Sequence, residues 1–139
     1  MNEPRLVVLD ASAVVAWLFR ERGAETVSKV LARAVLPVSA MVESLYRAKE
    51  LSHQLSGFEL YDAIVKMGVL VEPVIGDDAV RAASLISDSR QARIRANGPC
   101  LSLGDGLCLA VAERLNLPVT GGDQFWSSLN LNVEFFPFR

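Results

Sequence analysis

The sequence predicts an α/β fold, a three-layer α/β/α sandwich with a central parallel sheet. Short apolar runs rich in β-branched residues alternate with longer segments of helical periodicity, which is typical of parallel sheets. The first run, residues 6–9, is continuously apolar, as expected for a strand buried on both faces. No internal repeat or linker interrupts the 139 residues, so we expect one domain spanning residues 1–139.

The first strand ends at Asp10, and a helix with apolar side chains over residues 14–18 follows almost directly. We expect Ser12 to cap this helix. A strand that ends in a carboxylate places it at the carboxyl edge of a parallel sheet. Open α/β folds bind their ligands at that edge.

The remaining elements continue the alternation. We expect them in this order: a helix over 23–34, a strand over 35–38, a helix capped by Ser39 and running to about residue 51, a helix over 58–67 ended by Gly68, a strand over 69–74, a helix opened by Asp77 and Asp78 that must end by 97–99, an apolar helix over 102–115, a strand over 117–120, a short helix over 123–129 and a last strand over 133–136.

Composition excludes several functional classes. No apolar run approaches the roughly 20 residues that span a membrane, and no leader pattern is recognised, so a cytoplasmic protein is expected. Cys100 and Cys108 form neither a disulfide framework nor a zinc pattern, and Cys108 reads as a core residue. His53 is the only histidine, which argues against a histidine-centred triad. The chain is 51% hydrophobic, which fits either an interface or a tightly packed core.

Four carboxylates are expected at one edge of the sheet. Asp10 and Asp123 follow strands, while Glu43 and Asp105 lie in the first turns of helices that begin there. Each has a structural alternative: a helix cap for the three aspartates and an exposed helix position for Glu43. Together, however, four like charges repel one another unless a cation is present.

Such a cation would be a hard one. Oxygen-only ligands favour Mg²⁺, with Mn²⁺ as a possible substitute, and such an ion leaves coordination sites for phosphate oxygens. A metal that activates water would make a phosphodiester hydrolase that needs no histidine base. The formal net charge is −2, but the four acids account for it. Without them the chain has 14 basic and 12 acidic residues, so the rest of the protein is slightly basic.

A family resemblance follows from the same residues. The sequence has Asp10-Ala-Ser12 after an apolar strand, Glu43 on the helix after the second strand, Ser102-Leu-Gly-Asp105 opening an apolar helix, and Thr120-Gly-Gly-Asp123 after the fourth strand. This pattern resembles the PIN domain and, in length and layout, the VapC toxins of toxin–antitoxin pairs.

The resemblance implies a Mg²⁺-dependent endoribonuclease that forms a homodimer and is neutralised by a small antitoxin protein. It implies Asp10, Glu43, Asp105 and Asp123 as the catalytic acids, with Asp10 and Asp105 as the principal metal ligands. Ser12 and Thr120 would support them by hydrogen bonds. Gly121 and Gly122 depart from the alanine more common in this family, and we expect them to loosen the loop that carries Asp123.

Arg90, Arg93 and Arg95 precede the Asp105 helix and as a group could bind RNA phosphates. A solvated helix face is the alternative.

Three other functions compete with the ribonuclease. A haloacid-dehalogenase-type phosphatase carries a second aspartate two residues after the first, where this chain has Ser12. A nucleotide-binding Rossmann domain requires a Gly-rich turn after the first strand, which is absent. A non-catalytic PIN-like module that binds RNA or protein stays open, and metal-dependent RNA cleavage would discriminate it.

Overall fold

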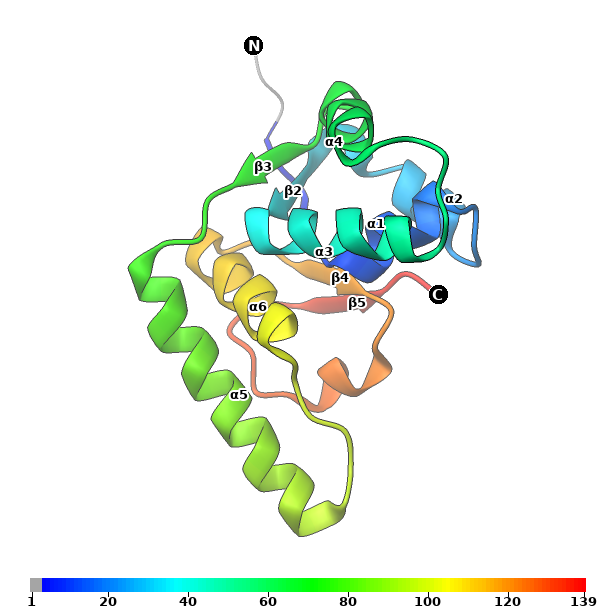
Figure 1. Cartoon of the computed structure of the whole chain (residues 1–139). Coiled ribbons are helices and arrows are strands. Elements are labelled where there is room, and N and C mark those ends of the chain that lie inside the picture. Colours follow the sequence, from blue (N-terminus) through cyan, green and yellow to red (C-terminus); the bar gives the residue numbers. More distant parts are fainter. Residues whose placement is uncertain (1–3) are drawn as a thin grey trace.

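The expected three-layer α/β/α fold is confirmed. The computed structural model describes residues 4–139, apart from the side chains of residues 95 and 96. Its five strands form one sheet in the order β3-β2-β1-β4-β5, and all neighbours are parallel (Figure 1). The strands are β1 (Val7–Leu9), β2 (Ala34–Pro37), β3 (Leu70–Glu72), β4 (Val119–Gly121) and β5 (Phe135–Pro137).

The helices connect these strands in chain order. They are α1 (Ala11–Leu18), α2 (Ala24–Ser28), the 3₁₀ turn η1 (Leu31–Arg33), α3 (Val38–Glu50), α4 (Gly57–Lys66), α5 (Gly76–Ala96), α6 (Leu103–Leu115) and the 3₁₀ turn η2 (Gln124–Ser128). No helix in the described part of the chain is long and apolar enough to cross a membrane.

The core forms on both faces of the sheet because successive strand residues point to opposite sides. Val7 and Leu9 of β1 pack with α1, α2, α3 and α4, whereas Val8 packs with α5, α6 and Trp126. All three residues of β1 are buried, which explains why this central strand is apolar throughout. Cys108 lies in the second layer and is buried, as expected for a core residue.

The sheet places several loops at one edge. Since all strands run in the same direction, β1, β2, β4 and β5 end at the same carboxyl edge. There α1 begins two residues after Leu9, α3 begins directly after Pro37, and η2 begins three residues after Gly121. The chain therefore delivers widely separated residues to one surface.

Ion pairs fasten the first turns of α5 to the last turn of α6, at the end of α6 away from Asp105. Arg114 Nε lies 2.9 Å from the buried Asp78 Oδ1, and the Asp78 Oδ2 atom accepts the backbone N–H of Ile75 at 2.9 Å. Asp78 thus holds the start of α5, where it was expected. On the same side, Arg81 and Glu113 form a two-contact pair. These contacts anchor α6, whose other end carries Asp105.

Three local expectations were wrong. The segment 23–34 is not one helix: Gly23 has a left-handed φ of 90° before α2, α2 ends at Ser28, and Ala34 is already in β2. The cap of α1 is Asp10, not Ser12, because the Asp10 side chain accepts the N–H of Ser12. Helix α3 begins at Val38 after Pro37 without a side-chain cap, so Ser39 lies inside it.

Candidate active site

Asp10 is the most buried of the predicted acids. It follows β1 and is only 6% exposed. Its Oδ2 atom accepts the Ser12 hydroxyl at 2.7 Å and the Ser12 N–H at 3.3 Å. Burial is the main reason that the pKa of Asp10 is raised to about 6, and the charges of Asp105 and Glu43 raise it further against the opposing hydrogen bonds of Ser12. The hydrogen bonds from Ser12 therefore do not offset the cost of burying the negative charge of Asp10 beside two other acids.

Glu43 reaches the same edge from α3. Its Oε1 atom occupies the space above Gly104, where a Cβ would come within 2.5 Å of it. Its Oε2 atom pairs with Arg47 Nη1 at 3.5 Å, one helical turn away. Burial raises the pKa of Glu43, Arg47 opposes this shift, and the charge of Asp105 adds to it. Glu43 therefore lies against the start of α6 and is not an ordinary surface residue.

Asp105 has two roles in its environment. As part of a capping box, its Oδ2 atom accepts the Ser102 N–H at 3.0 Å, and its own N–H donates to Ser102 Oγ at 3.1 Å. The structural alternative considered for Asp105 is thus present in the fold. Its charge also raises the pKa values of Asp10, Glu43 and Asp123. The negative charge of Asp105 thus acts on each of the other three acids.

Asp123 lies at the side of this cluster. It is exposed, precedes η2, and makes no side-chain cap for that turn. Partial burial raises its pKa most, and Asp105 adds to the increase, opposed by the nearby N–H of Phe125. The structure therefore brings Asp10, Glu43 and Asp105 into electrostatic reach of one another, and Asp123 within reach of the charge of Asp105.

Ser12 joins two parts of the site. While donating to Asp10, its Oγ atom accepts the N–H of Gly122 at 3.0 Å, which ties the loop after β4 to the end of β1. Thr120 acts differently. Its hydroxyl donates to the carbonyl of Phe136 on β5, and its own carbonyl accepts the N–H of Asp10 at 3.0 Å. Thr120 thus fixes the strands, and its hydroxyl does not contact the acids.

The two glycines before Asp123 are packed, which contradicts the expected loosening of this loop. A Cβ at Gly121 would lie 3.2 Å from the Trp126 ring and 3.3 Å from Asp10 Cβ. A Cβ at Gly122 would lie 2.8 Å from Arg139 Nη2. Neighbouring side chains thus approach both positions closely, which explains why both residues are glycine.

The donor set fits a hard cation. Carboxylate oxygens are what Mg²⁺ prefers, and the buried Asp10 faces two like charges. Within residues 4–139, no group of three or more Asp, Glu, His or Cys side chains is arranged to hold an ion together. Because Mg²⁺ typically takes only one or two protein carboxylates and keeps several waters, Asp10 and Asp105 suffice in number.

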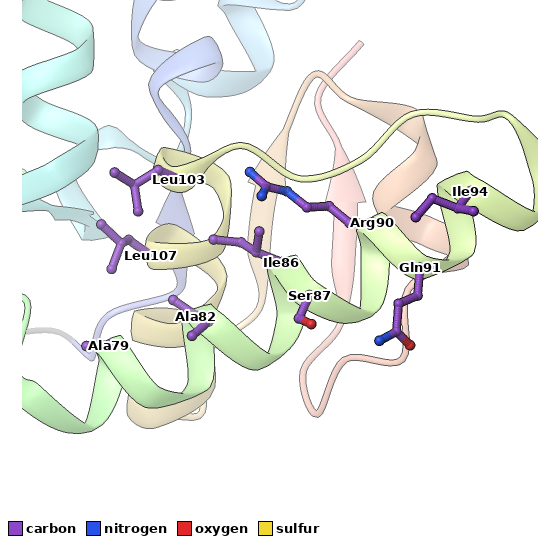
Figure 2. Close-up of a pocket in the computed structure, with 10 residues that line it drawn as sticks. Ala79, Ala82, Ile86, Ser87, Arg90, Gln91, Ile94, Leu103 and Leu107 are labelled. Carbon is purple, nitrogen blue, oxygen red and sulfur yellow. The ribbon is translucent and has the colours of Figure 1, made fainter.

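Arg90 of α5 lies along a groove beside α6, whereas Arg93 lines separate hollows near Cys100 and Phe125. Arg90 reaches back toward the start of α6, where Leu103 lines the same groove (Figure 2). This groove has a volume of about 470 Å³ and is also lined by Ile86, Leu107 and Ile94. Arg93 Nη1 lies 3.7 Å from Cys100 Sγ. The side chain of Arg95 lies outside the part of the chain that is described.

Sequence reasoning missed Arg47 and Gly104. Arg47 could have been found, since it lies four residues after Glu43 on a predicted helix, the spacing at which opposite charges pair. Gly104 gave no signal, because the side chain that fills its space comes from another helix.

Comparisons with known proteins identify the family to which the fold belongs. The PIN domain family matches residues 7–126, and the chain belongs to this family. No curated protein sequence matches the chain.

Among solved structures, VapBC2 from Rickettsia felis bound to a promoter DNA fragment is similar, with a TM-score of 0.68, 11% identity, and coverage of 95% of this chain and 98% of that one. DNA-bound VapBC from Salmonella typhimurium has a TM-score of 0.66 and 12% identity, and the match covers 97% of this chain and 99% of that one. VapC20 from Mycobacterium tuberculosis, a sarcin–ricin loop cleaving toxin, has a TM-score of 0.61 and 13% identity, and the match covers 90% of this chain and 95% of that one. At these identities the likeness establishes the fold.

Proposed function

We propose that this protein is a Mg²⁺-dependent endoribonuclease, the toxin of a toxin–antitoxin pair, acting in the cytoplasm. The observation that carries the proposal is the buried carboxylate of Asp10, which faces the charges of Asp105 and Glu43 at the carboxyl edge. Membership of the PIN domain family supports it, as does the likeness to VapBC complexes and to a sarcin–ricin loop cleaving toxin.

Asp10 and Asp105 would hold the Mg²⁺ or Mn²⁺ ion. Bound there, the cation would neutralise the clustered charge, lower the pKa of water and offset charge on the departing oxygen of a phosphodiester. Ser12 would orient Asp10 through its 2.7 Å hydrogen bond. Glu43, whose pKa is raised by burial, would accept a proton from water at Oε1 or Oε2. Asp123 would complete the acidic set.

Arg90 and Arg93 would bind RNA phosphates beside these acids. Both lie on the last turns of α5, and Arg90 extends toward the start of α6, where Asp105 lies (Figure 2). Guanidinium groups are well suited to phosphate because they offer several donors in a planar fork. The negative acids and the positive arginines would therefore act on different parts of one RNA strand.

We expect the purified protein to cleave RNA with Mg²⁺ and to leave it intact with a chelator. Asp105→Asn should lower the cleavage rate by about 100-fold or more, since it removes a metal-ligand charge. The asparagine side chain still offers an oxygen to the Ser102 N–H, so the cap persists. Gel electrophoresis of labelled RNA measures the rate, and thermal melts measure stability.

Ser102→Ala is the matched control. It removes the other half of the capping box and should cost about 1 kcal/mol of stability while leaving cleavage largely intact. Cleavage that persists in chelator or in Asp105→Asn would contradict the proposal. An intact RNA under all conditions would favour the non-catalytic PIN-like module.

The proposal includes two protein partners. Exposed apolar side chains lie on α3 and at the start of α6, among them Val42, Tyr46 and Leu103, and these would be covered in a homodimer. A small antitoxin would bring a basic side chain to the acidic cluster, where charge complementarity is greatest.

Sedimentation should therefore give the mass of a dimer. Coexpression with the product of a neighbouring small reading frame should give a complex that no longer cleaves RNA. A monomer at all concentrations, with no inhibitory product encoded nearby, would contradict both partner assignments.

A further inference from the structure

Phe138 and Arg139, which follow β5, lie at the carboxyl edge in a slot formed by two glycines. At Gly23, whose φ is 90°, a Cβ would lie 2.5 Å from Phe138 Cδ2. At Gly122 a Cβ would lie 2.8 Å from Arg139 Nη2 and 3.0 Å from Nε. The guanidinium group thus lies directly against the backbone of the loop that leads to Asp123.

Several contacts hold Arg139 in this orientation. Its Cζ atom lies 5.0 Å from the centroid of the Phe138 ring, and Phe138 itself is buried. The main-chain oxygen of Arg139 accepts the Gln124 Nε2 donor at 3.0 Å, which fixes the backbone from which this side chain extends. A guanidinium group oriented in advance loses less conformational freedom when it binds an anion.

The charge of Arg139 is only loosely compensated. In the described part of the chain its ion-pair partner is Glu21, at 3.7 Å, and the two side chains are 36% and 44% exposed. An exposed pair at this distance contributes little energy and is easily exchanged for another anion. Within the described residues, Arg47 pairs with one of the four acids, whereas no ion pair joins Arg139 to any of them.

Arg139 is close to the candidate active site through a short chain of contacts. Its guanidinium packs on Gly122, the Gly122 N–H donates to Ser12 Oγ, and Ser12 Oγ donates to Asp10 Oδ2. A strand of RNA whose phosphate lies at Asp10 would pass this cation on the Asp123 side.

We propose that Arg139 binds a backbone phosphate of the RNA on the Asp123 side of the acidic cluster, and that Gly122 is required for its position. The inference rests on the proposed ribonuclease function and adds to it a substrate-binding residue outside the predicted acids and outside α5. Arginine suits this role because its fork can donate two hydrogen bonds to one phosphate.

The test measures RNA binding by fluorescence anisotropy, with a short labelled single-stranded RNA of mixed sequence and Mg²⁺. All variants carry Asp10→Asn so that the probe is not cut. Arg139→Gln should weaken binding roughly fivefold, the effect of one exposed charge-assisted contact. It should also lower the slope of log affinity against log salt by about 0.7, the value for one phosphate contact with a single strand.

Gly122→Ala supplies an independent approach to the same contact. The added Cβ would displace the Arg139 guanidinium but retain the N–H that donates to Ser12, so this variant should reproduce the loss seen with Arg139→Gln. The double variant should bind no more weakly than Arg139→Gln alone, because both changes remove one interaction. Arg139→Lys should keep the salt slope and lose part of the affinity.

Lys66→Gln is the matched control, since it removes the same charge near the start of β3, at the opposite edge of the sheet. It should bind RNA like the parent. Unchanged affinity and salt slope in Arg139→Gln would overturn the inference, as would lower affinity with an unchanged slope or an equal loss in Lys66→Gln. If the Asp10→Asn parent binds no RNA, the inference fails, and the proposed function fails with it if the protein with Asp10 intact also leaves RNA uncut. If Asp105→Asn abolishes cleavage while Arg139→Gln binds normally, only the inference fails.

Discussion

Replacing Asp10 with asparagine is expected to stabilise the metal-free protein by about 2–3 kcal/mol at neutral pH and to abolish RNA cleavage. The ionised carboxylate is buried next to two like charges, so the folded state bears a cost that a neutral amide lacks. Asparagine caps helices as well as aspartate does, so α1 should keep its N-terminal hydrogen bond. Loss of function thus coincides with a gain in stability.

The pH dependence follows from the direction of the shift. The pKa of Asp10 rises from 3.8 to about 6 on folding, so the folded state binds this proton more tightly than the unfolded state. Its contribution to stability is therefore present below about pH 4 and is lost as the pH rises through about 6. The difference in stability between Asp10→Asn and the parent should grow over that interval and level off above it.

The effect of metal on the melting temperature is a further test of the role of Asp10. Mg²⁺ or Mn²⁺ should raise the melting temperature of the parent by mass action and that of Asp10→Asn much less. Asp88→Asn, which removes an exposed charge on α5, should respond to metal as the parent does. An Asp10→Asn protein that melts below the parent in chelator and responds equally to metal would identify Asp10 as a helix cap only.

Gly104→Ala should lower RNA cleavage by about 10- to 100-fold without destabilising the protein. The new Cβ would lie 2.5 Å from Glu43 Oε1, so the carboxylate must move, and displacements of this size can reduce rates by about 100-fold. Alanine favours the helical conformation over glycine by up to about 1 kcal/mol, which offsets the crowding. Rates of RNA cleavage and thermal melts together test this expectation.

Gly57→Ala is the control for this substitution. Gly57 also lies in the first turn of a helix, but a Cβ there would contact nothing within 4 Å. It should preserve cleavage and equal or exceed the parent in stability. Parent-like cleavage by Gly104→Ala would show that the position of Glu43 is not required.

Much of the architecture was predictable because it depends on local pattern. The apolar run before Asp10 correctly predicted a strand buried on both faces, and the Ser102–Asp105 spacing correctly located the start of α6. Parallel strands then require that the residues following them share one edge, so Asp10 and Asp123 were predicted at the same edge of the sheet. The helix expected over 23–34 failed because periodicity does not reveal that Gly23 has a positive φ or that Ala34 enters a strand.

The finer features of the site depend on contacts distant in sequence. Glu43 lies over Gly104, and Arg139 lies over Gly122, so each glycine is explained only by a side chain from another element. A single sequence indicates that such a glycine exists but not what approaches it. Similarly, the Thr120 hydroxyl could have pointed to the acids or to β5, and only the sheet register decides that it contacts Phe136.

The central position of β1 has a consequence for the order in which the site can assemble during synthesis. Its neighbours are β2, made soon afterwards, and β4, which begins at Val119, more than a hundred residues later. Asp10 emerges early from the ribosome, yet its backbone N–H has no partner until Thr120 arrives, and Ser12 cannot hold the loop before Gly122 exists. In a nascent chain, therefore, the complete acidic cluster cannot form until the ribosome has translated the chain as far as Thr120 and Gly122.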